Sequence, residues 1–507
     1  MLTKMPILRF ISCVMFSLLL LGSYARGATI RFGISELPPA LGNPYTAMGM
    51  PSGYFFGSLY DALTKVTKDG DLSPSLALNW VQVAPARWLF TLRKDIKFHN
   101  GSPFDSRSVV ATIAYLQSPE AARFLLANEV KNIAGVRALS DHEVEFTTIE
   151  PDAILPRRLS LMMMIEPQSW AKLGPVDYAR APVGTGPYAL VEWGRGDGSA
   201  TLKSTQSAWR KAKEIDTLMY VKVPNAVARE QGLLSGKLDI IDSLNPDSVT
   251  SIRNAGFNIQ THQRAQVLSI ALPNVGRQDS PLKSAEVRRA LNLAVDRPSI
   301  AKYIFGGLVE AASQGAVPGT VGFNPDLKPY PFNPEMAQSL LVDAGYKNGF
   351  PLTIAVLQAE GDAGMLAYQK VTQDLAKVGV DAQIRAITGT EFLRRFMGNE
   401  WGEYDAFSLL WNNEPMRDVG RAIEYFSCLR PNPFFCDETV TDAIKAGRSE
   451  ADPEKRKQML QQIMARMKEM APAIWLTNTI VITASRPGIE GIEMGATGLL
   501  FEDIVIH

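Results

Sequence analysis

Apolar residues recur with two different periods, and both periods occur from one end of the chain to the other. Alternating or continuous apolar runs of strand length predict strands at 29–34, 88–93, 143–146, 188–191, 267–272, 352–356 and 405–411, with two more near residues 474 and 480. Apolar residues at helical spacing predict helices at 54–63, 106–116, 226–234, 285–303, 334–344, 368–378 and 453–470. Ser106 is a candidate cap for the second of these helices. This mixture predicts an α/β or α+β protein.

The N-terminus has the pattern of a secretory signal peptide. Lys4 and Arg9 precede an uncharged apolar run at residues 10–21, and small residues lead to a cleavage point after Ala25. The run has about 12 residues, whereas a membrane-spanning helix needs about 20. We therefore expect residues 1–25 to be removed and the mature chain to be soluble and exported.

Composition narrows the choice of function. Apolar residues make up 46% of the 507 residues and charged residues 21%, which is ordinary for a globular protein. The chain has 52 basic and 52 acidic residues. Because a nucleic-acid-binding protein usually has an excess of basic residues, the sequence does not predict a nucleic-acid partner. After cleavage only Cys428 and Cys436 remain, and in an oxidising compartment such a pair is most simply a disulfide. No His lies near them, so a metal site is weakly supported.

Motifs for catalysis are weak or missing. Residues 184–189 match a loose G-x-G-x-x-A nucleotide pattern, but Pro187 has no N–H for a phosphate and the run continues as a strand. No P-loop, H-E-x-x-H or G-x-S-x-G motif occurs. The sequence thus predicts neither a cofactor nor an enzyme, although acids that meet only in space leave an exported hydrolase open.

A polar loop after a predicted buried strand is the strongest candidate site. Residues 411–418 read Trp-Asn-Asn-Glu-Pro-Met-Arg-Asp. Trp411 could offer a flat face to a ligand, Glu414 could hold an ammonium group, and Arg417 could hold a carboxylate or phosphate. The same loop supplies two further candidates, Asn413 and Asp418. The alternative interpretation is an exposed, solvated loop.

Four stretches together resemble one known family. They are residues 88–104 (Trp-Leu-Phe-Thr-Leu-Arg-Lys-Asp-Ile-Lys-Phe-His-Asn-Gly-Ser-Pro-Phe), 182–188 (Pro-Val-Gly-Thr-Gly-Pro-Tyr) with the later 234–239 (Leu-Ser-Gly-Lys-Leu-Asp), 287–297 (Val-Arg-Arg-Ala-Leu-Asn-Leu-Ala-Val-Asp-Arg), and 325–334 with 344–346. In this order they resemble the extracytoplasmic solute-binding proteins of ATP-driven importers, family 5, the dipeptide-, oligopeptide- and nickel-binding group.

The resemblance implies a two-lobed α/β periplasmic-binding-protein fold with an extra subdomain and a hinge of two crossovers. The expected parts are lobe I at 28–263 plus 478–507, a subdomain at about 59–164, lobe II at 264–473, and crossovers at 264–268 and 474–478. The implied protein is a monomeric periplasmic receptor. It would capture a small peptide-like, zwitterionic or anionic solute between the lobes and deliver it to an inner-membrane permease.

The resemblance also implies a site. In peptide-binding members an acidic residue shortly after the tryptophan matched by Trp411 holds the ligand's α-amino group, and Glu414 is the nearest match in a loop that departs from the family pattern. Further candidates lie in the two lobes: Tyr45 and Phe55, then Gln358 and Glu360. A receptor for a metal chelate remains an alternative.

Overall fold

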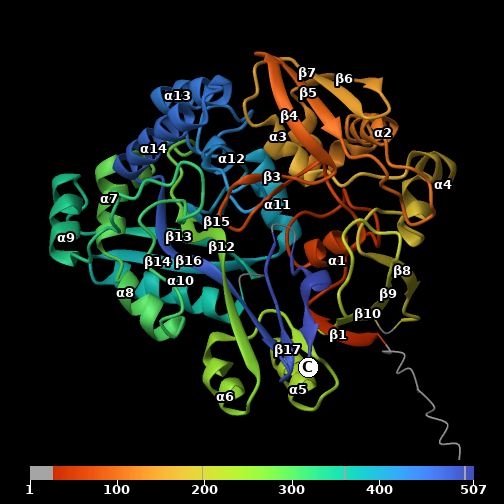
Figure 1. Cartoon of the computed structure of the whole chain (residues 1–507). Helices are drawn as coiled ribbons and strands as arrows, with labels where there is room; N and C mark the ends of the chain where they lie inside the picture. Colours follow the sequence, from red (N-terminus) through yellow and green to blue (C-terminus); the bar gives the residue numbers. More distant parts are fainter. Residues whose placement is uncertain (1–26, 197, 359–360, 496–497) are drawn as a thin grey trace, which may run out of the picture.

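The computed structural model describes residues 27–507, except residues 197, 359–360 and 496–497. A ten-stranded sheet runs through the molecule (Figure 1). Its strands lie in the order β14 (Val380–Ile387), β13 (Phe350–Leu357), β15 (Ala406–Asn412), β12 (Asn258–Ala271), β16 (Ala473–Ser485), β11 (Ile240–Ile241), β1 (Ala28–Ile34), β10 (Ile215–Lys222), β9 (Ser199–Ser204) and β8 (Tyr188–Trp193). Helices and strands mix as an α/β fold requires, so the predicted class is confirmed.

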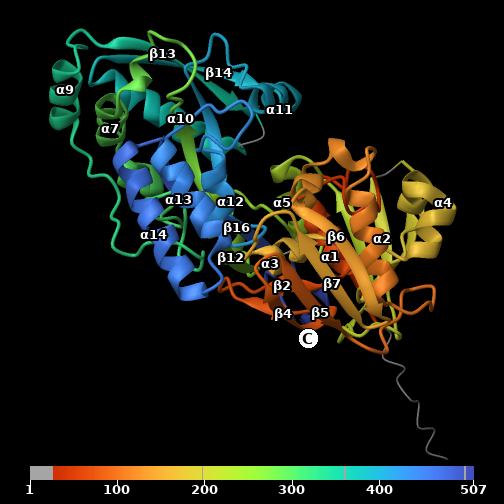
Figure 2. The same ribbon diagram turned by 90° about the horizontal axis from the view of Figure 1, so that it is seen from above.

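Two long antiparallel strands join the halves of this sheet. β12 and β16 pair from Asn258↔Ser485 to Ala271↔Ala473, and their register is interrupted between Gln263 and Val267. β16 pairs with β11 on one side of this interruption, and β12 pairs with β15 on the other. We call the part built on β1 and β8–β11 the first lobe and the part built on β13–β15 the second lobe. Figure 2 shows these lobes as two bodies.

The buried apolar residues separate in the same way. Two clusters take their buried members from residues before 253 or after 481, and two others take theirs from 265–476. Among the described residues no cluster draws buried members from both sets. Since no apolar core would have to break, the lobes can move about the β12–β16 pair.

A smaller four-stranded sheet packs on the first lobe. Its order is β4 (Ala77–Ala84), β5 (Arg87–Leu92), β7 (Glu143–Thr148) and β6 (Ile133–Ser140). β2 (Thr64–Val66) and β3 (Leu72–Pro74) form a hairpin beside it, and β17 (Ile489–Glu490) pairs with β18 (Val505–Ile506) near the C-terminus. Phe90 and Phe146 belong to the same buried cluster as Phe32 of β1, so the small sheet shares the core of the first lobe.

The helices flank these sheets. The first lobe carries α1 (Ser52–Leu59), α2 (Ser106–Leu116), α3 (Leu155–Arg158), α4 (Pro167–Arg180), α5 (Ala226–Leu234) and α6 (Val249–Asn254). The second carries α7 (Ala285–Leu293), α8 (Arg297–Ser299), α9 (Pro334–Asp343), α10 (Gly361–Ala376), α11 (Gly389–Gly398), α12 (Val419–Glu424), α13 (Glu438–Ser449) and α14 (Pro453–Met470).

Three sequence predictions of elements were wrong. The helix expected at 285–303 ends at Leu293 and restarts at α8, where Asp296 caps the N–H of Ser299 and Pro298 has no N–H to continue the ladder. The strands expected near 474 and 480 are one strand, β16. The cap of α2 is Asp105, whose carboxylate accepts the N–H of Arg107, and not Ser106.

The G-x-G sequence is a packed turn. The N–H of Gly184 donates to Nδ1 of His99 (3.2 Å), and Nε2 of the same ring donates to the carbonyl of Gly186 (3.0 Å). A Cβ at Gly184 would lie 1.8 Å from the carbonyl oxygen of Leu59 at the end of α1. Because the turn leads into a strand, it offers no helix N-terminus to a phosphate.

Candidate functional site

A cavity of about 180 Å³ lies between the two lobes, and we call it the interlobe cavity. The second lobe contributes the start of the loop after β15 and one residue of α12. The first lobe contributes the segment that leads into α1 and residues around 125 and 161. The lining residues are Pro44, Ala47, Met48, Gly49, Met50, Gly53, Phe56, Leu125, Leu126, Ser160, Leu161, Met163, Asn412, Glu414, Pro415 and Arg421.

The first-lobe wall is largely apolar. Phe56 and Leu126 are 3% and 1% exposed because they are also part of the first-lobe core. Met48, Met50 and Met163 add thioether side chains, which adapt to differently shaped apolar groups. The first-lobe wall therefore combines rigid core side chains with thioethers that can adapt to a ligand.

Glu414 on the second-lobe wall is held by an arginine of the hinge. Nε of Arg264 donates to Oε1 and Oε2 of Glu414 at 3.0 and 2.9 Å, and Nη2 also donates to Oε2. Arg264 follows Gln263 directly, at the interruption of the β12–β16 register. Burial alone would lower the pKa of Arg264, but the attraction of Glu414 outweighs it and raises that pKa. The Arg264–Glu414 ion pair therefore links the cavity wall to the hinge.

Polar contacts between the lobes lie near the same wall. Glu129 accepts from Nη1 of Arg158 (2.5 Å) within the first lobe and from Nε of Arg421 (3.1 Å) across the interface. Arg157 donates to the carbonyl of Met416 at 2.8 Å. Burial works to raise the pKa of Glu129, but its two arginines prevail and hold that pKa below the ordinary value. The lobes are thus in contact along this side.

Trp411 differs from its predicted role. Its ring is 1% exposed, stacks on Phe426 with centroids 4.3 Å apart and meets the edge of Trp475 at 5.5 Å. The backbone of Gly315 approaches so closely that a Cβ there would lie 1.9 Å from the indole. In this conformation Trp411 is a core side chain and offers no face to a ligand.

Two other predicted loop residues are also buried. Asp418 caps α12 through the N–H of Gly420 and pairs with Arg456, whose Nη1 lies 2.6 Å from its carboxylate. Asn413 donates to the carbonyl of Gly315 at 2.8 Å. Both side chains are 0% exposed, so they shape the loop and are out of a ligand's reach in this conformation.

The remaining predicted residues are scattered. Arg417 is half-buried with φ of 46° and has no ion pair among the described residues; burial lowers its pKa. Tyr45 and Phe55 lie in the first-lobe core, and the hydroxyl of Tyr45 donates to the carbonyl of Met163. Gln358 is exposed at the end of β13, and Glu360 lies outside the described residues. Of the predicted site residues that the structure describes, Glu414 alone lines the interlobe cavity.

Two further cavities compete with this one. A cavity of about 500 Å³ is lined by Asp61, Trp209, Arg210 and neighbouring residues, all from the first lobe and the C-terminal segment, so lobe closure would not enclose its contents. A groove of about 380 Å³ separates residues 245–247 from α10, and Tyr303, Leu366, Gln369 and Gln373 in its wall are exposed. The interlobe cavity differs from these two. Its first-lobe wall is deeply buried, and this wall faces a charged loop of the second lobe.

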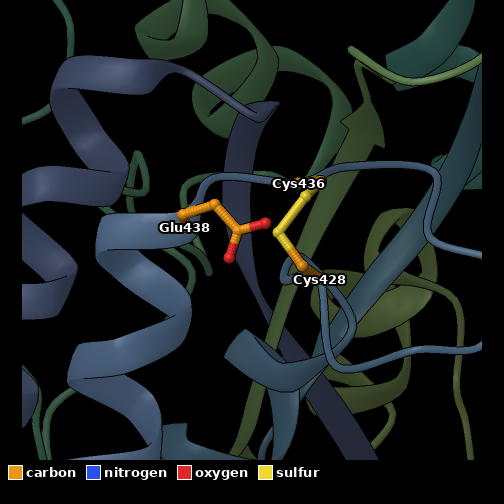
Figure 3. A group of neighbouring side chains, drawn as sticks. All are labelled: Cys428, Cys436 and Glu438. Carbon is orange, nitrogen blue, oxygen red and sulfur yellow. A yellow bond between two sulfur atoms is a disulfide. The ribbon is translucent and has the colours of Figure 1, made fainter.

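Cys428 and Cys436 form a disulfide beside Glu438 at the start of α13 (Figure 3). One sulfur atom of each cysteine and one carboxylate oxygen of Glu438 lie within 4.8 Å of one another, and the described part of the chain holds no other such group of possible metal ligands. Both sulfur atoms are used by the disulfide, so only one ligand would remain for a metal ion. The bridge closes the loop after α12.

A match between this sequence and a known protein family identifies the kind of protein that has this hinge and cavity. The sequence model of bacterial extracellular solute-binding proteins, family 5 Middle, matches residues 71–432, more than half of the chain. The chain belongs to this family. It is therefore a solute-binding protein, as its sequence motifs predicted. Within the described residues, no helix has the length and apolar character needed to cross a membrane.

The matches to similar proteins extend over almost the whole chain. A dipeptide-binding protein of Pseudomonas aeruginosa is 25% identical over 88% of this chain and 90% of its own length. A glutathione-binding protein of Escherichia coli K12 is 25% identical, covering 94% and 95%. Among solved structures, an Agrobacterium tumefaciens R10 protein in complex with agropinic acid has a TM-score of 0.79 at 23% identity, covering 95% and 99%. A Brucella suis protein in complex with Fe(III)-EDTA has 0.81 at 21%, covering 95% and 100%. These structures support the two-lobed fold.

Sequence reasoning missed most of the cavity wall. The sequence patterns marked neither Met48 nor Met50, and nothing marked Leu125, Leu161 or Met163. The two methionines flank Gly49 in a region of otherwise small residues, which is the one local feature that could have drawn attention to them. The partner of Glu414 was also missed, because Arg264 lies 150 residues away in sequence.

Proposed function

We propose that this protein captures a small peptide-like, zwitterionic or anionic solute in the interlobe cavity and delivers it to the membrane permease of an ABC importer. The ligand biases an equilibrium between open and closed lobes, and the closed form is what the permease recognises. The protein acts in the periplasm after removal of residues 1–25 and works as a monomer. It has no catalytic role.

One observation carries the proposal: the interlobe cavity takes its walls from both lobes. A solute in contact with Phe56 on one side and Glu414 on the other stabilises closure, because an open form loses one of the two contacts. The separation of the cores at 253–264 and 477–481 supports a division into lobe I (28–263 plus 478–507, with a subdomain at about 59–164) and lobe II (264–473).

Glu414 and the neighbouring Arg417 are our candidates for the ligand-sensing loop. Arg417 is attracted by Glu414 and Asp69 but forms no ion pair among the described residues, so it remains available to an anionic group of the solute and disfavours a second cation. A metal-chelate ligand is the second candidate, because the structural neighbours include a protein in complex with Fe(III)-EDTA. Such a chelate is also anionic.

Native mass spectrometry of the purified protein tests the proposal. We expect a non-covalent small molecule bound at one copy per chain, lost on mild activation. A ligand-dependent rise in melting temperature should follow, since binding to the folded state alone contributes RT ln(1 + [L]/Kd), or about 2.7 kcal/mol at 100 times Kd. Turnover of a bound solute into a product, with no stoichiometric retention, would contradict a receptor and favour a hydrolase.

A further inference from the structure

The carboxylate that faces the interlobe cavity is already occupied. Both oxygens of Glu414 accept hydrogen bonds from Arg264, and the two side chains are only 14% and 21% exposed. The N–H of Glu414 also donates to Oδ1 of Asn412 at 3.0 Å, which fixes the start of the loop. An ammonium group entering the cavity would have to displace a bidentate guanidinium, and Arg binds carboxylates in this geometry better than a point charge does.

The second charged side chain in the wall is paired as well. Arg421 donates to Glu129 at 3.1 Å, and both side chains are almost fully buried, at 12% and 8% exposure. The two charged residues of the lining therefore leave no net charge for a ligand to neutralise. A charged group placed in this cavity would lose its hydration and gain no ion pair in return.

The rest of the lining favours an apolar occupant. The thioethers of Met48, Met50 and Met163 face the cavity together with Phe56 and several leucines. The volume of about 180 Å³ slightly exceeds that of an engineered apolar cavity of about 150 Å³ that holds benzene. A branched aliphatic or aromatic group of a solute has a suitable size.

We infer that the interlobe cavity receives an uncharged, apolar end of the solute that lacks a free ammonium group, and that Glu414 holds the hinge arginine instead of the ligand. The ligand class is thus an amine-blocked or amine-free solute with one apolar group, such as an N-acyl peptide or N-acyl amino acid. This inference rests on the proposed function, because it takes the interlobe cavity as the ligand site. Selectivity then comes from the Arg264–Glu414 pair, which excludes ammonium groups.

Matched pairs of probes test the inference. Leu-Phe, Met-Leu and Phe-Leu are compared with their N-acetyl forms in competition by native mass spectrometry and by titration calorimetry. For the native protein we expect at least one acetylated form to bind tenfold or more tightly than its free amine. The inference would be overturned if the native protein bound the free amines more tightly and Glu414→Gln lost this preference for free amines. Binding of neither form would also overturn it.

Two variants at the arginine make the test specific. Arg264→Gln frees the Glu414 carboxylate, so we expect the preference to move at least tenfold toward the free amines. Arg264→Lys keeps a cation at the carboxylate and should retain the preference for the acetylated forms. Equal preferences in both variants and the native protein would contradict a selective role for the pair. Melting curves confirm that each variant is folded.

The Glu414→Gln variant covers the case in which Arg264→Gln does not fold. It removes the carboxylate that could hold an ammonium group, so we expect the acetylated probes to keep their preference over the free amines in this variant, whatever the change in overall affinity. A preference for the free amines in Glu414→Gln would contradict the inference. Failure of the proposed function is distinguishable: the protein would then retain no small molecule of any class. A protein that retains free-amine peptides or other solutes remains a receptor, although the inferred ligand class would be wrong.

Discussion

Arg264 and Glu414 form a bidentate ion pair that joins the hinge to the wall of the interlobe cavity. Arg264 lies where the pairing of β12 and β16 is interrupted, and Glu414 follows the end of β15 by two residues. A ligand that moves the Glu414 loop must therefore also move the guanidinium of the hinge. This connection gives a physical route from cavity occupancy to lobe closure.

The geometry of the Arg264–Glu414 pair can be tested by measuring how a substitution changes the free energy of unfolding. Arg264→Lys replaces a planar fork with a single ammonium, so one of the hydrogen bonds to Glu414 is lost. We expect the free energy of unfolding to fall by about 1–2 kcal/mol, as for loss of a charge-assisted hydrogen bond in a partly buried site. Urea titration measures it. The matched control is Arg394→Lys, whose pair with Glu400 is more than half exposed and should change little.

Glu129 should control how firmly the lobes close. Glu129→Gln removes the charge shared by Arg158 and Arg421, and Arg421 belongs to the other lobe. Removing one partner of a buried pair costs about 3–5 kcal/mol. We expect a lower melting temperature and a larger radius of gyration by small-angle X-ray scattering. The control is Glu145→Gln, which also loses two arginine contacts, but both arginines, Arg87 and Arg137, are more than half exposed. An unchanged radius of gyration for Glu129→Gln would contradict an interlobe role.

The buried ion pair of Asp418 and Arg456 should make the free energy of unfolding depend on pH in a specific way. Burial acts to raise its pKa, but Arg456 outweighs burial and lowers that pKa below the ordinary value of 3.8. The unfolded state therefore binds a proton before the folded state as the pH falls, and the stability from ionised Asp418 is present above pH 3.8 and lost below it. At neutral pH we expect Asp418→Asn to cost about 3–5 kcal/mol.

The pH series compares the native protein with this variant. The difference in free energy of unfolding should be constant from neutral pH to about pH 5 and shrink as the pH falls through the range below the ordinary pKa of a carboxyl group. Asp177→Asn serves as the control, because Asp177 forms an exposed pair with Arg180 and should give no such trend. A difference that grew at lower pH would show that the sign of the Asp418 shift is wrong.

Packing against Trp411 is predicted to be tight. In Gly315→Ala the new methyl carbon would lie 1.9 Å from the indole, so the ring or the backbone must move. Overpacking of this kind costs typically about 1–3 kcal/mol, and we expect a loss at the upper end of that range. Gly389→Ala is the control, because a Cβ there meets nothing within 4 Å and α11 starts at that residue. If Gly315→Ala were as stable as the native protein, Trp411 would have room to turn toward a ligand.

The sequence was sufficient for the class of fold because local patterns carry that information. The helix at 453–470 was predicted with the bounds that α14 has, and β1 and α5 were close to their predicted ranges. Errors occurred where tertiary pairing decides the length of an element. β12 extends nine residues before the apolar run that predicted it, since pairing with β16 stabilises its polar half.

The candidate site was harder to predict for a physical reason. A polar loop after a strand suggests a cleft, and Glu414 does line one. The same pattern could not tell that Trp411 is enclosed by Phe426 and Gly315, or that Asp418 is committed to Arg456, because each partner is distant in sequence. The apolar first-lobe wall could not be predicted from the sequence for the same reason, since its residues come from several separate segments.

A crystal structure with bound solute tests the central claim most directly. The compound that gives the largest thermal shift should be soaked or co-crystallised with the mature protein. We predict electron density for the solute in the interlobe cavity, in contact with Phe56 or Met163 of the first lobe and with the Glu414 loop of the second. Density confined to the cavity beside Asp61 and Arg210, which the first lobe and the C-terminal segment form alone, would contradict the claim.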